Sequence, residues 1–227
     1  MKKTLYLLGS IILILCCISC EDTNDKETLV DDHLSHLLTS LETIYQDDEQ
    51  ILKMTSEQLK VHGSLQELQT NIQTYVETTD NLDFLFIAKD DDYIIYPELE
   101  EEYYTPSDMP WYRQAIINNG LYMSPTYIDF YTNQAVYTMS LAVYDGQDLL
   151  GVIGLDRSFP PDLFDFKDQA DFDYEICVIS HSNTYVYHTE PHNIGEKASE
   201  SIADGWESKS AQTDFGWSIE IRYKKDN

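Results

Sequence analysis

The chain carries three stretches that decide its fold: YTPSDMPWYRQA at residues 104–115, SPTYID at 124–129 and GVIGLD at 151–156. In the first stretch, Asp108 is a good N-cap and Pro110 falls in the first turn, while Gly120 is a good stop. These signals predict a short helix over residues 111–118. The other two stretches belong to segments with strand-like patterns, so the helix is expected to lead into a β-meander.

Strand patterns on both sides of this helix predict one antiparallel sheet. Its five expected strands are residues 84–88, 93–96, 122–128, 135–144 and 149–155. Asp145-Gly146 marks a tight turn, and Asp129 and Tyr131 are expected to shape the turn before residue 135. Lys89-Asp90-Asp91-Asp92 joins the first two strand patterns and predicts a hairpin loop. Its three aspartates lack the ligand spacing and the glycine of a calcium loop.

Two helices are predicted ahead of the sheet. Apolar residues from Val30 to Leu52 recur with a helical period that extends toward Val61, and a second stripe runs from Leu65 to Val76. Ser64 and Glu67 form a capping-box pattern for the second helix. Residues 29–80 are therefore expected to form a helical stalk.

Two histidines in the first helix, His33 and His36, are three residues apart and have Asp31 and Asp32 beside them. The ordinary interpretation is a solvated helix face, and a metal site is the alternative. We expect the solvated face.

A smaller second module is predicted over residues 160–227, with Pro160-Pro161 at its boundary. Its expected elements are a short helix at 163–166 and strands at 174–180, 184–188 and 217–223. Cys177 lies in an apolar run and is expected to be a small buried core residue.

The N-terminus has the features of a targeting segment. Lys2 and Lys3 precede a short apolar run, and Cys17-Ile18-Ser19-Cys20 resembles a bacterial lipobox, although Cys17 stands where lipoboxes usually carry Leu, Val or Ile. We expect removal of residues 1–19, lipidation of Cys20 and a polar tether over residues 20–28. The protein would then lie in the cell envelope, facing the periplasm or the exterior. An uncleaved membrane anchor and secretion with free release are the alternatives.

The composition disfavours several classes of partner and reaction. A formal charge of −27 repels phosphates and so disfavours nucleic acids. No His-Glu-x-x-His sequence, Gly-rich phosphate loop or nucleophile-elbow context occurs. Only Cys177 remains beyond the proposed lipid site, so no cysteine-based metal site is expected. We expect no enzyme activity, no catalytic residue, no metal and no cofactor.

Residues 83–158 resemble the ligand-binding module of the double Cache family, which comprises extracytoplasmic sensor domains of bacterial receptors. TYVYHTEPHNIGEK at 184–197 and FGWS at 215–218 resemble the membrane-proximal module of that family. The resemblance implies an α+β fold, in which a long N-terminal helix packs along two PAS-like antiparallel sheet modules. The membrane-distal, ligand-binding module would cover residues 81–159, and a reduced membrane-proximal module would cover residues 160–227.

The resemblance also implies a ligand site. In the amino-acid-binding members, the pattern is Tyr, four residues, Arg, one residue, Trp, and then a downstream Tyr and Asp. These positions fall on Tyr104, Met109, Trp111, Tyr127 and Asp156. The family pattern implies that the first three positions hold a ligand carboxylate and the last two hold an ammonium group.

Met109 departs from this pattern. Arginine pairs a carboxylate with two parallel hydrogen bonds, whereas methionine has no donor. Arg113 is not expected to substitute, because it lies two residues after Trp111, and residues i and i+2 point to different sides of a helix. The aromatic residues and Asp156 still suit a cation, so a cationic amine fits better than an α-amino acid.

Two function classes remain open from the sequence. One is a lipid-anchored small-molecule sensor that signals through a separate receptor or kinase partner. The other is a structural or interaction lipoprotein that retains the Cache fold without binding a ligand. The site residues also have a structural interpretation. Trp111 and Tyr127 suit a protein core, and a partner such as Arg157 would account for the charge of Asp156 without a ligand.

Overall fold

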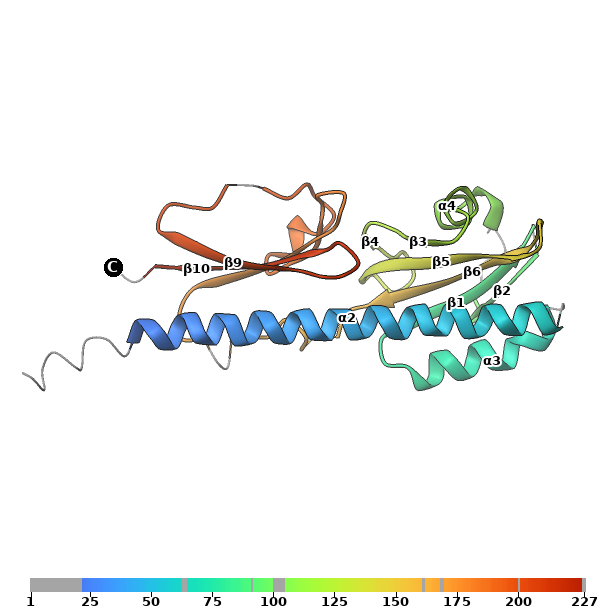
Figure 1. Ribbon diagram of the computed structural model, residues 1–227, viewed down its shortest axis with the longest axis horizontal. Coiled ribbons are helices and arrows are strands. Elements are labelled where there is room, and N and C mark those ends of the chain that lie inside the picture. Colours follow the sequence, from blue (N-terminus) through green and yellow to red (C-terminus); the bar gives the residue numbers. More distant parts are fainter. Residues whose placement is uncertain are drawn as a thin grey trace, which may run out of the picture.

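A computed structural model describes residues 22–62, 65–90, 92–99, 105–160, 162–167, 170–199 and 201–225. Two antiparallel sheets follow one another along a single long helix, α2 (Figure 1). This arrangement confirms the expected α+β class with a long N-terminal helix. Cys20 and Tyr104 lie outside the described residues.

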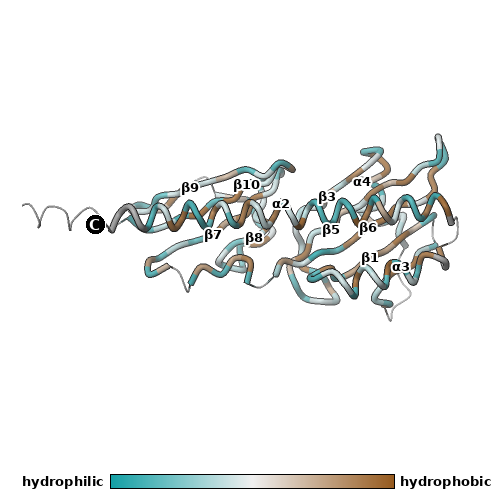
Figure 2. Tube along the Cα trace, turned by 60° about the horizontal axis from the view of Figure 1, so that its bottom comes forward, coloured by the Kyte–Doolittle hydropathy of each residue, from teal (hydrophilic) through white to brown (hydrophobic). Residues whose placement is uncertain are grey.

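Helix α2 (Asp22–His62) forms because one of its faces is mostly apolar. Val30, Leu34 and Leu37 recur every three or four residues and are buried, and the stripe continues to Leu59. Figure 2 shows hydrophobic and hydrophilic residues alternating along the helix as it turns. The helix includes residues 22–28, which were expected to be a tether, because they contain no Gly or Pro that would stop it. No helix in the described ranges is long and apolar enough to cross a membrane.

Helix α3 (Leu65–Thr78) packs beside α2 and buries Leu68 and Ile72 in the same core. Its expected capping box cannot be placed, because Ser64 and the side chain of Glu67 lie outside the described part.

The first sheet, which we call the distal sheet, has six antiparallel strands in the order β2-β1-β6-β5-β3, with β4 also paired to β5. The strands are β1 (Leu82–Lys89), β2 (Asp92–Tyr96), β3 (Leu121–Met123), β4 (Tyr127–Ile128), β5 (Ala135–Asp145) and β6 (Asp148–Ser158). One strand had been expected over residues 122–128. It is interrupted at 124–126, where Pro125 has no N–H to donate to a ladder, so the sheet has six strands instead of five.

Both faces of the distal sheet are buried. In β1, Leu85 and Ile87 join the core toward α2 and α3, whereas Phe84 and Phe86 join a second core under α4 (Pro110–Asn118). Figure 1 shows α2 and α4 on opposite sides of this sheet. Gly154 of β6 permits the packing, because a Cβ there would lie 2.0 Å from the Phe86 ring.

The ends of α4 differ from the prediction. Met109 is the N-cap and Asp108 instead ends the 3-10 helix η1 (Pro106–Asp108), because a residue before proline avoids helical dihedral angles. At the other end, Asn119 itself takes the left-handed conformation, with φ 51°, so Gly120 is not needed there.

The second sheet, the proximal sheet, has the order β8-β7-β10-β9. Its strands are β7 (Tyr174–Ile179), β8 (Tyr185–His188), β9 (Trp206–Gln212) and β10 (Ser218–Lys224), and a 3-10 helix, η2 (Pro191–Asn193), follows β8. Strand β9 was not predicted, because this edge strand is mostly polar and shows no alternation.

The predicted helix at 163–166 is wrong. Turn-type hydrogen bonds run from Leu163 N to Pro160 O and from Asp165 N to Asp162 O. A segment this short gains too few helical hydrogen bonds to offset nucleation, and burial of Leu163, Phe164 and Phe166 fixes it instead.

His33 and Cys177 both lie in the core of the proximal region. The solvated face expected for the histidines is wrong for His33, whose ring stacks on Phe166 at 4.1 Å between centroids and is buried. No group of three metal-ligating side chains occurs within the described ranges. Cys177 is fully buried, as expected, and burial raises the pKa of its thiol to about 12.

Candidate ligand-binding pocket

A cavity of about 620 Å³ lies on the α4 side of the distal sheet. Its walls are mostly aromatic and aliphatic, with a few hydroxyl and carboxyl groups. The lining residues are Phe84, Phe86, Ile95, Leu99, Met109, Pro110, Trp111, Tyr122, Ser124, Pro125, Thr126, Tyr127, Ile128, Asp129, Phe130, Tyr131, Thr138 and Asp156. This volume and composition are typical of small-molecule sites.

Four of the five predicted site residues line this one cavity: Met109, Trp111, Tyr127 and Asp156. They come from the start of α4, from β4 and from β6. The fifth, Tyr104, lies outside the described residues.

Asp156 is one of two carboxyl groups that line the cavity among the described residues, the other being Asp129. Its side chain is buried, and its Oδ1 accepts a hydrogen bond of 2.6 Å from the Thr138 hydroxyl. Burial raises the pKa of Asp156 to about 7; the Thr138 hydrogen bond opposes this rise and nearby Asp129 adds to it.

The Tyr127 hydroxyl lies 2.9 Å from the Thr138 hydroxyl, so the three side chains form a hydrogen-bonded chain. Burial, and secondly the Asp156 carboxylate, raise the pKa of the Tyr127 phenol, which therefore stays protonated at neutral pH.

Strand register brings these groups together. Thr138 of β5 and Phe84 of β1 pair with Asp156 from its two sides. Side chains directly opposite one another in a sheet point to the same face. The backbone of the distal sheet therefore fixes a hydroxyl and an aromatic ring beside the carboxylate.

Trp111 and Met109 form the helix side of the cavity. The Trp111 ring lies 4.6 Å from the Phe86 ring between centroids, and the Trp111 carbonyl accepts a hydrogen bond from Ser140. Trp111 is thus both a core residue and a wall of the cavity. Met109 offers no hydrogen-bond donor there.

No Lys, Arg or His occurs among the described residues that line the cavity. Arg113 is exposed and donates to the Asp108 carbonyl oxygen at 2.6 Å. It therefore does not replace the arginine that is missing at Met109.

Two polar residues of the cavity were not singled out as ligand contacts. Thr138 could have been found only from the register of β5 against β6. Asp129 had been assigned a turn-shaping role, and it does accept bonds from the backbone N–H groups of Tyr131 and Thr132. It also lines the cavity.

Arg157 does not pair with Asp156. It faces the opposite side of the sheet, where its guanidinium forms a buried ion pair with Asp48 of α2. The Tyr137 hydroxyl also donates to Asp48. Burial opposes the charge of Arg157, but Asp48 outweighs this effect and raises the pKa of the guanidinium.

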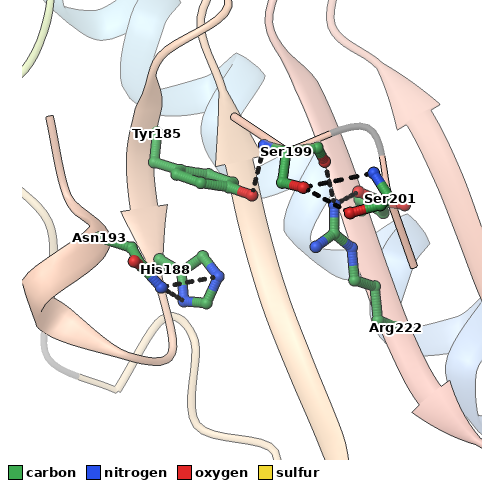
Figure 3. Close-up of polar contacts among 7 residues, drawn as sticks. Tyr185, His188, Asn193, Ser199, Ser201 and Arg222 are labelled. Carbon is green, nitrogen blue, oxygen red and sulfur yellow. Dashed lines mark hydrogen bonds and ion pairs between the residues drawn. The ribbon is translucent and has the colours of Figure 1, made fainter. Parts of the chain in front are cut away.

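The proximal module carries a separate polar cluster, shown in Figure 3. The Tyr185 hydroxyl accepts a bond of 3.0 Å from the Ser199 N–H, and Arg222 donates to the Ser199 carbonyl at 3.0 Å. Burial lowers the pKa of His188, whose Nδ1 accepts from the Glu190 N–H at 2.9 Å. These bonds hold the segment after β8 against the sheet.

Comparison with known proteins gives a family for part of the chain. Residues 48–160 match the family model described as "Methyl-accepting chemotaxis protein-like, first PDC sensor domain". No curated protein sequence matches the chain.

Several solved structures share its fold over most of its length. The ligand-binding domain of the chemoreceptor CtaA of Pseudomonas fluorescens, in complex with L-serine, has a TM-score of 0.72 at 13% identity, covering 90% of this chain and 100% of that chain. The ligand-binding domain of the amino acid chemoreceptor PctC of Pseudomonas aeruginosa, in complex with GABA, has a TM-score of 0.70 at 14% identity, covering 88% and 100%. The PctB domain of the same organism, in complex with L-Arg, has a TM-score of 0.70 at 15% identity, covering 88% and 94%. All three are ligand-binding domains of chemoreceptors.

Proposed function

We propose that the protein senses a small molecule and that its ligand is a cationic amine. The match of residues 48–160 to a chemotaxis-protein-like PDC sensor domain supports the sensing role. The observation that carries this proposal is Asp156, a buried carboxyl in a cavity whose described lining holds no basic side chain.

The charge balance of the cavity favours an ammonium group. A buried carboxylate without a counter-charge is costly, and an amine ligand would supply that charge. Tyr127 and Trp111 line the same cavity and offer aromatic faces to the cation. Ligand binding would thus stabilise a group that the empty cavity destabilises.

The same balance disfavours ligands with a carboxylate. Met109 stands where an arginine would pair with that group, and methionine cannot donate to it. A ligand carboxylate in this cavity would be desolvated without a cationic partner among the described lining residues. An amino acid should therefore bind less tightly than the matching amine.

Four ligands of the same carbon count test the proposal: butylamine, butyrate, 2-aminobutyrate and 4-aminobutyrate. Thermal-shift measurements on the full chain should show the largest stabilisation with butylamine. A ligand at a hundredfold excess over its Kd stabilises the folded state by about 2.7 kcal/mol. Tighter binding of any of the three carboxylates than of butylamine would refute the amine assignment.

Asp156→Asn should abolish the butylamine shift, because it removes the counter-charge with little change in shape. Asp148→Asn is the matched control, since Asp148 lies on the same strand but is exposed. Equal loss of binding in both variants would show that the effect is not specific to the cavity.

Met109→Arg should weaken butylamine binding by adding a like charge, and should admit 2-aminobutyrate by restoring the carboxylate partner. Competition between the two ligands in the variant measures this exchange. An unchanged preference for butylamine would mean that residue 109 does not contact the ligand.

We also propose that Cys20 is lipidated and that the mature protein is held at the cell envelope. The support is the apolar segment that ends in Ile-Ser-Cys. Cys20→Ala should release the protein from the membrane fraction, and acyl labelling should appear on the wild type only. Unchanged membrane partitioning of the variant, with no label on the wild type, would exclude lipidation.

A separate receptor or kinase partner is proposed to read the bound state, by analogy with the sensor domains of chemoreceptors. Cross-links to such a partner in cells should depend on butylamine and be lost in Asp156→Asn. If none of the four ligands stabilises the chain, the alternative of an interaction lipoprotein without a ligand is favoured.

A further inference from the structure

We infer that the ligand is an amine with a bulky apolar group, and that this group lies on an aromatic lip formed by Ile128, Phe130 and Tyr131 at the mouth of the cavity. The inference rests on the proposed function, because it requires the ammonium group to bind at Asp156. It concerns the opposite end of the ligand.

The lip concentrates exposed apolar side chains at one point of the surface. Eight large hydrophobic side chains are exposed among the described residues, and four of them lie within residues 127–131. Phe130 is the most exposed of all, at 87%, and Ile128 is exposed at 55%. Such clustering on an otherwise acidic protein indicates a binding surface, whereas single exposed apolar residues need no explanation.

The lip is continuous with the interior of the cavity. Its three residues also line the cavity. The Tyr131 ring contacts the Phe84 ring edge-on, with centroids 6.3 Å apart, and Phe84 pairs across the strands with Asp156. An apolar path therefore runs from the carboxylate to the surface, and one ligand can contact both ends.

The lip is held in place before any ligand arrives. Asp129 Oδ2 accepts bonds from the Tyr131 N–H at 3.0 Å, from the Thr132 N–H at 2.6 Å and from the Thr132 hydroxyl at 2.9 Å. The Asp129 N–H donates to the Gln134 carbonyl at 2.9 Å. A preformed surface costs little ordering entropy on binding, so the contact area adds directly to affinity.

The chemistry of the lip selects the apolar part of the ligand. Asp129 Oδ2 is engaged by three hydrogen bonds within its own turn. The three residues of the lip present rings and aliphatic carbons as their contact surface. The Phe130 and Tyr131 rings are nearly perpendicular, at 85° and 5.6 Å between centroids. A flat aromatic group fits such edge-to-face packing, whereas a short alkylamine would leave the lip uncovered.

Isothermal titration of the full chain with ethylamine and with 2-phenylethylamine tests this inference, and 3-phenylpropionate serves as the anionic counterpart. We expect 2-phenylethylamine to bind at least about tenfold more tightly than ethylamine, because burial of a phenyl group adds that much affinity. Phe130→Ala should reduce this advantage by about tenfold. Ile117→Ala is the matched control, because Ile117 is 71% exposed on α4 and is not among the lining residues.

The outcomes separate this inference from the proposed function. If both amines bind equally and Phe130→Ala changes neither, the lip does not contact the ligand, and the amine assignment stands without it. If neither amine binds while 3-phenylpropionate does, the amine assignment fails and this inference fails with it. Loss of the phenyl advantage in Phe130→Ala, with Ile117→Ala unchanged, supports the inference.

Discussion

At the scale of the residue, the affinity of the cavity for an ammonium group should depend on whether Asp156 is protonated. Burial raises its pKa to about 7, so the neutral acid and the carboxylate are both present near neutral pH. Only the carboxylate offers a counter-charge to an ammonium group. The empty cavity and the occupied cavity should therefore differ in proton content.

We expect the affinity for butylamine to rise with pH. Below about pH 7 the amine must displace a proton from Asp156, so Kd should increase by about tenfold for each pH unit below 6 and should level off above about pH 8. Calorimetry in buffers of different ionisation enthalpy should also detect proton release at the acidic end. An affinity that stays constant, or that falls as the pH rises, contradicts the assignment of Asp156 as the cation site.

Some residues that line the cavity could be predicted from the sequence, and others could not. Met109, Trp111, Tyr127 and Asp156 were predicted to lie together because the spacing of a known pattern survives around them, and all four line the cavity. Thr138 was not predicted, because a bulge between Val143 and Tyr144 shifts the register of β5 against β6 by one residue. If the strand pairing is counted from the turn without a bulge, Tyr137 instead of Thr138 lies opposite Asp156. The local sequence contains no pattern that predicts the bulge.

At the scale of the element, strands β5 and β6 contribute side chains with distinct contacts to both faces of the distal sheet. Thr138 and Asp156 face the cavity, whereas their neighbours Tyr137 and Arg157 face α2 and contact Asp48. Arg157 also donates to the Asp80 carbonyl, which lies between α3 and β1. One strand pair therefore joins the ligand cavity to the long helix.

Breaking the Asp48–Arg157 pair from one side should be strongly destabilising. Arg157→Met leaves Asp48 buried without its cation and should cost about 3 to 5 kcal/mol of unfolding free energy, measured by urea denaturation. The double variant with Asp48→Leu should recover much of this loss. Lys53→Met on the same helix breaks only the exposed pair with Glu49 and should cost less than about 1 kcal/mol. Equal losses for Arg157→Met and Lys53→Met would show that burial does not matter here.

Elements with a clear hydrophobic periodicity could be predicted from the sequence. Elements whose shape depends on tertiary packing could not. The apolar stripe of α2 and the alternation of β5 are visible in the sequence. Strand β9 shows no such pattern, because it is a polar edge strand that forms by pairing with β10. The segment 163–166 has apolar residues in a helix-like cluster, but contacts such as the stacking of Phe164 on Tyr187 at 3.6 Å determine its shape.

At the scale of the whole molecule, the two modules share one continuous core along α2. Trp217, which precedes β10, lies 5.5 Å from the Tyr137 ring of the distal sheet and 6.2 Å from the Phe159 ring, measured between centroids. Leu41 and Leu52 of α2 belong to the same hydrophobic cluster as residues of both sheets. The modules should therefore unfold together.

Trp217→Ala should uncouple the two modules. Scanning calorimetry of the wild type should give one transition, and the variant should give two, because a large ring is lost from the contact between modules. Butylamine should then raise only the transition of the distal module. Trp206→Ala in the edge strand β9 is the control and should keep a single transition at a lower temperature. A single transition in Trp217→Ala would mean that the remaining contacts, along α2 and through Phe159, suffice to couple the modules.

The resemblance to a two-module family predicted the overall plan, including the order of helix, distal module and proximal module. It did not predict which residues form the contact between the two modules. The Trp217–Tyr137 contact joins residues far apart in the sequence. Trp217 belongs to the FGWS stretch that resembles the second module, but nothing in that stretch pointed to a contact with Tyr137.

The two buried faces of the distal sheet have a consequence for protein engineering. Positions 84, 138 and 156 face the cavity, while positions 85, 137 and 157 face the stalk helices. Substitutions on the first set can change ligand preference without disturbing the side chains that reach the stalk. A library randomised at the cavity-facing positions should therefore yield many folded members with new ligand preferences, which makes the distal module a starting scaffold for engineered biosensors.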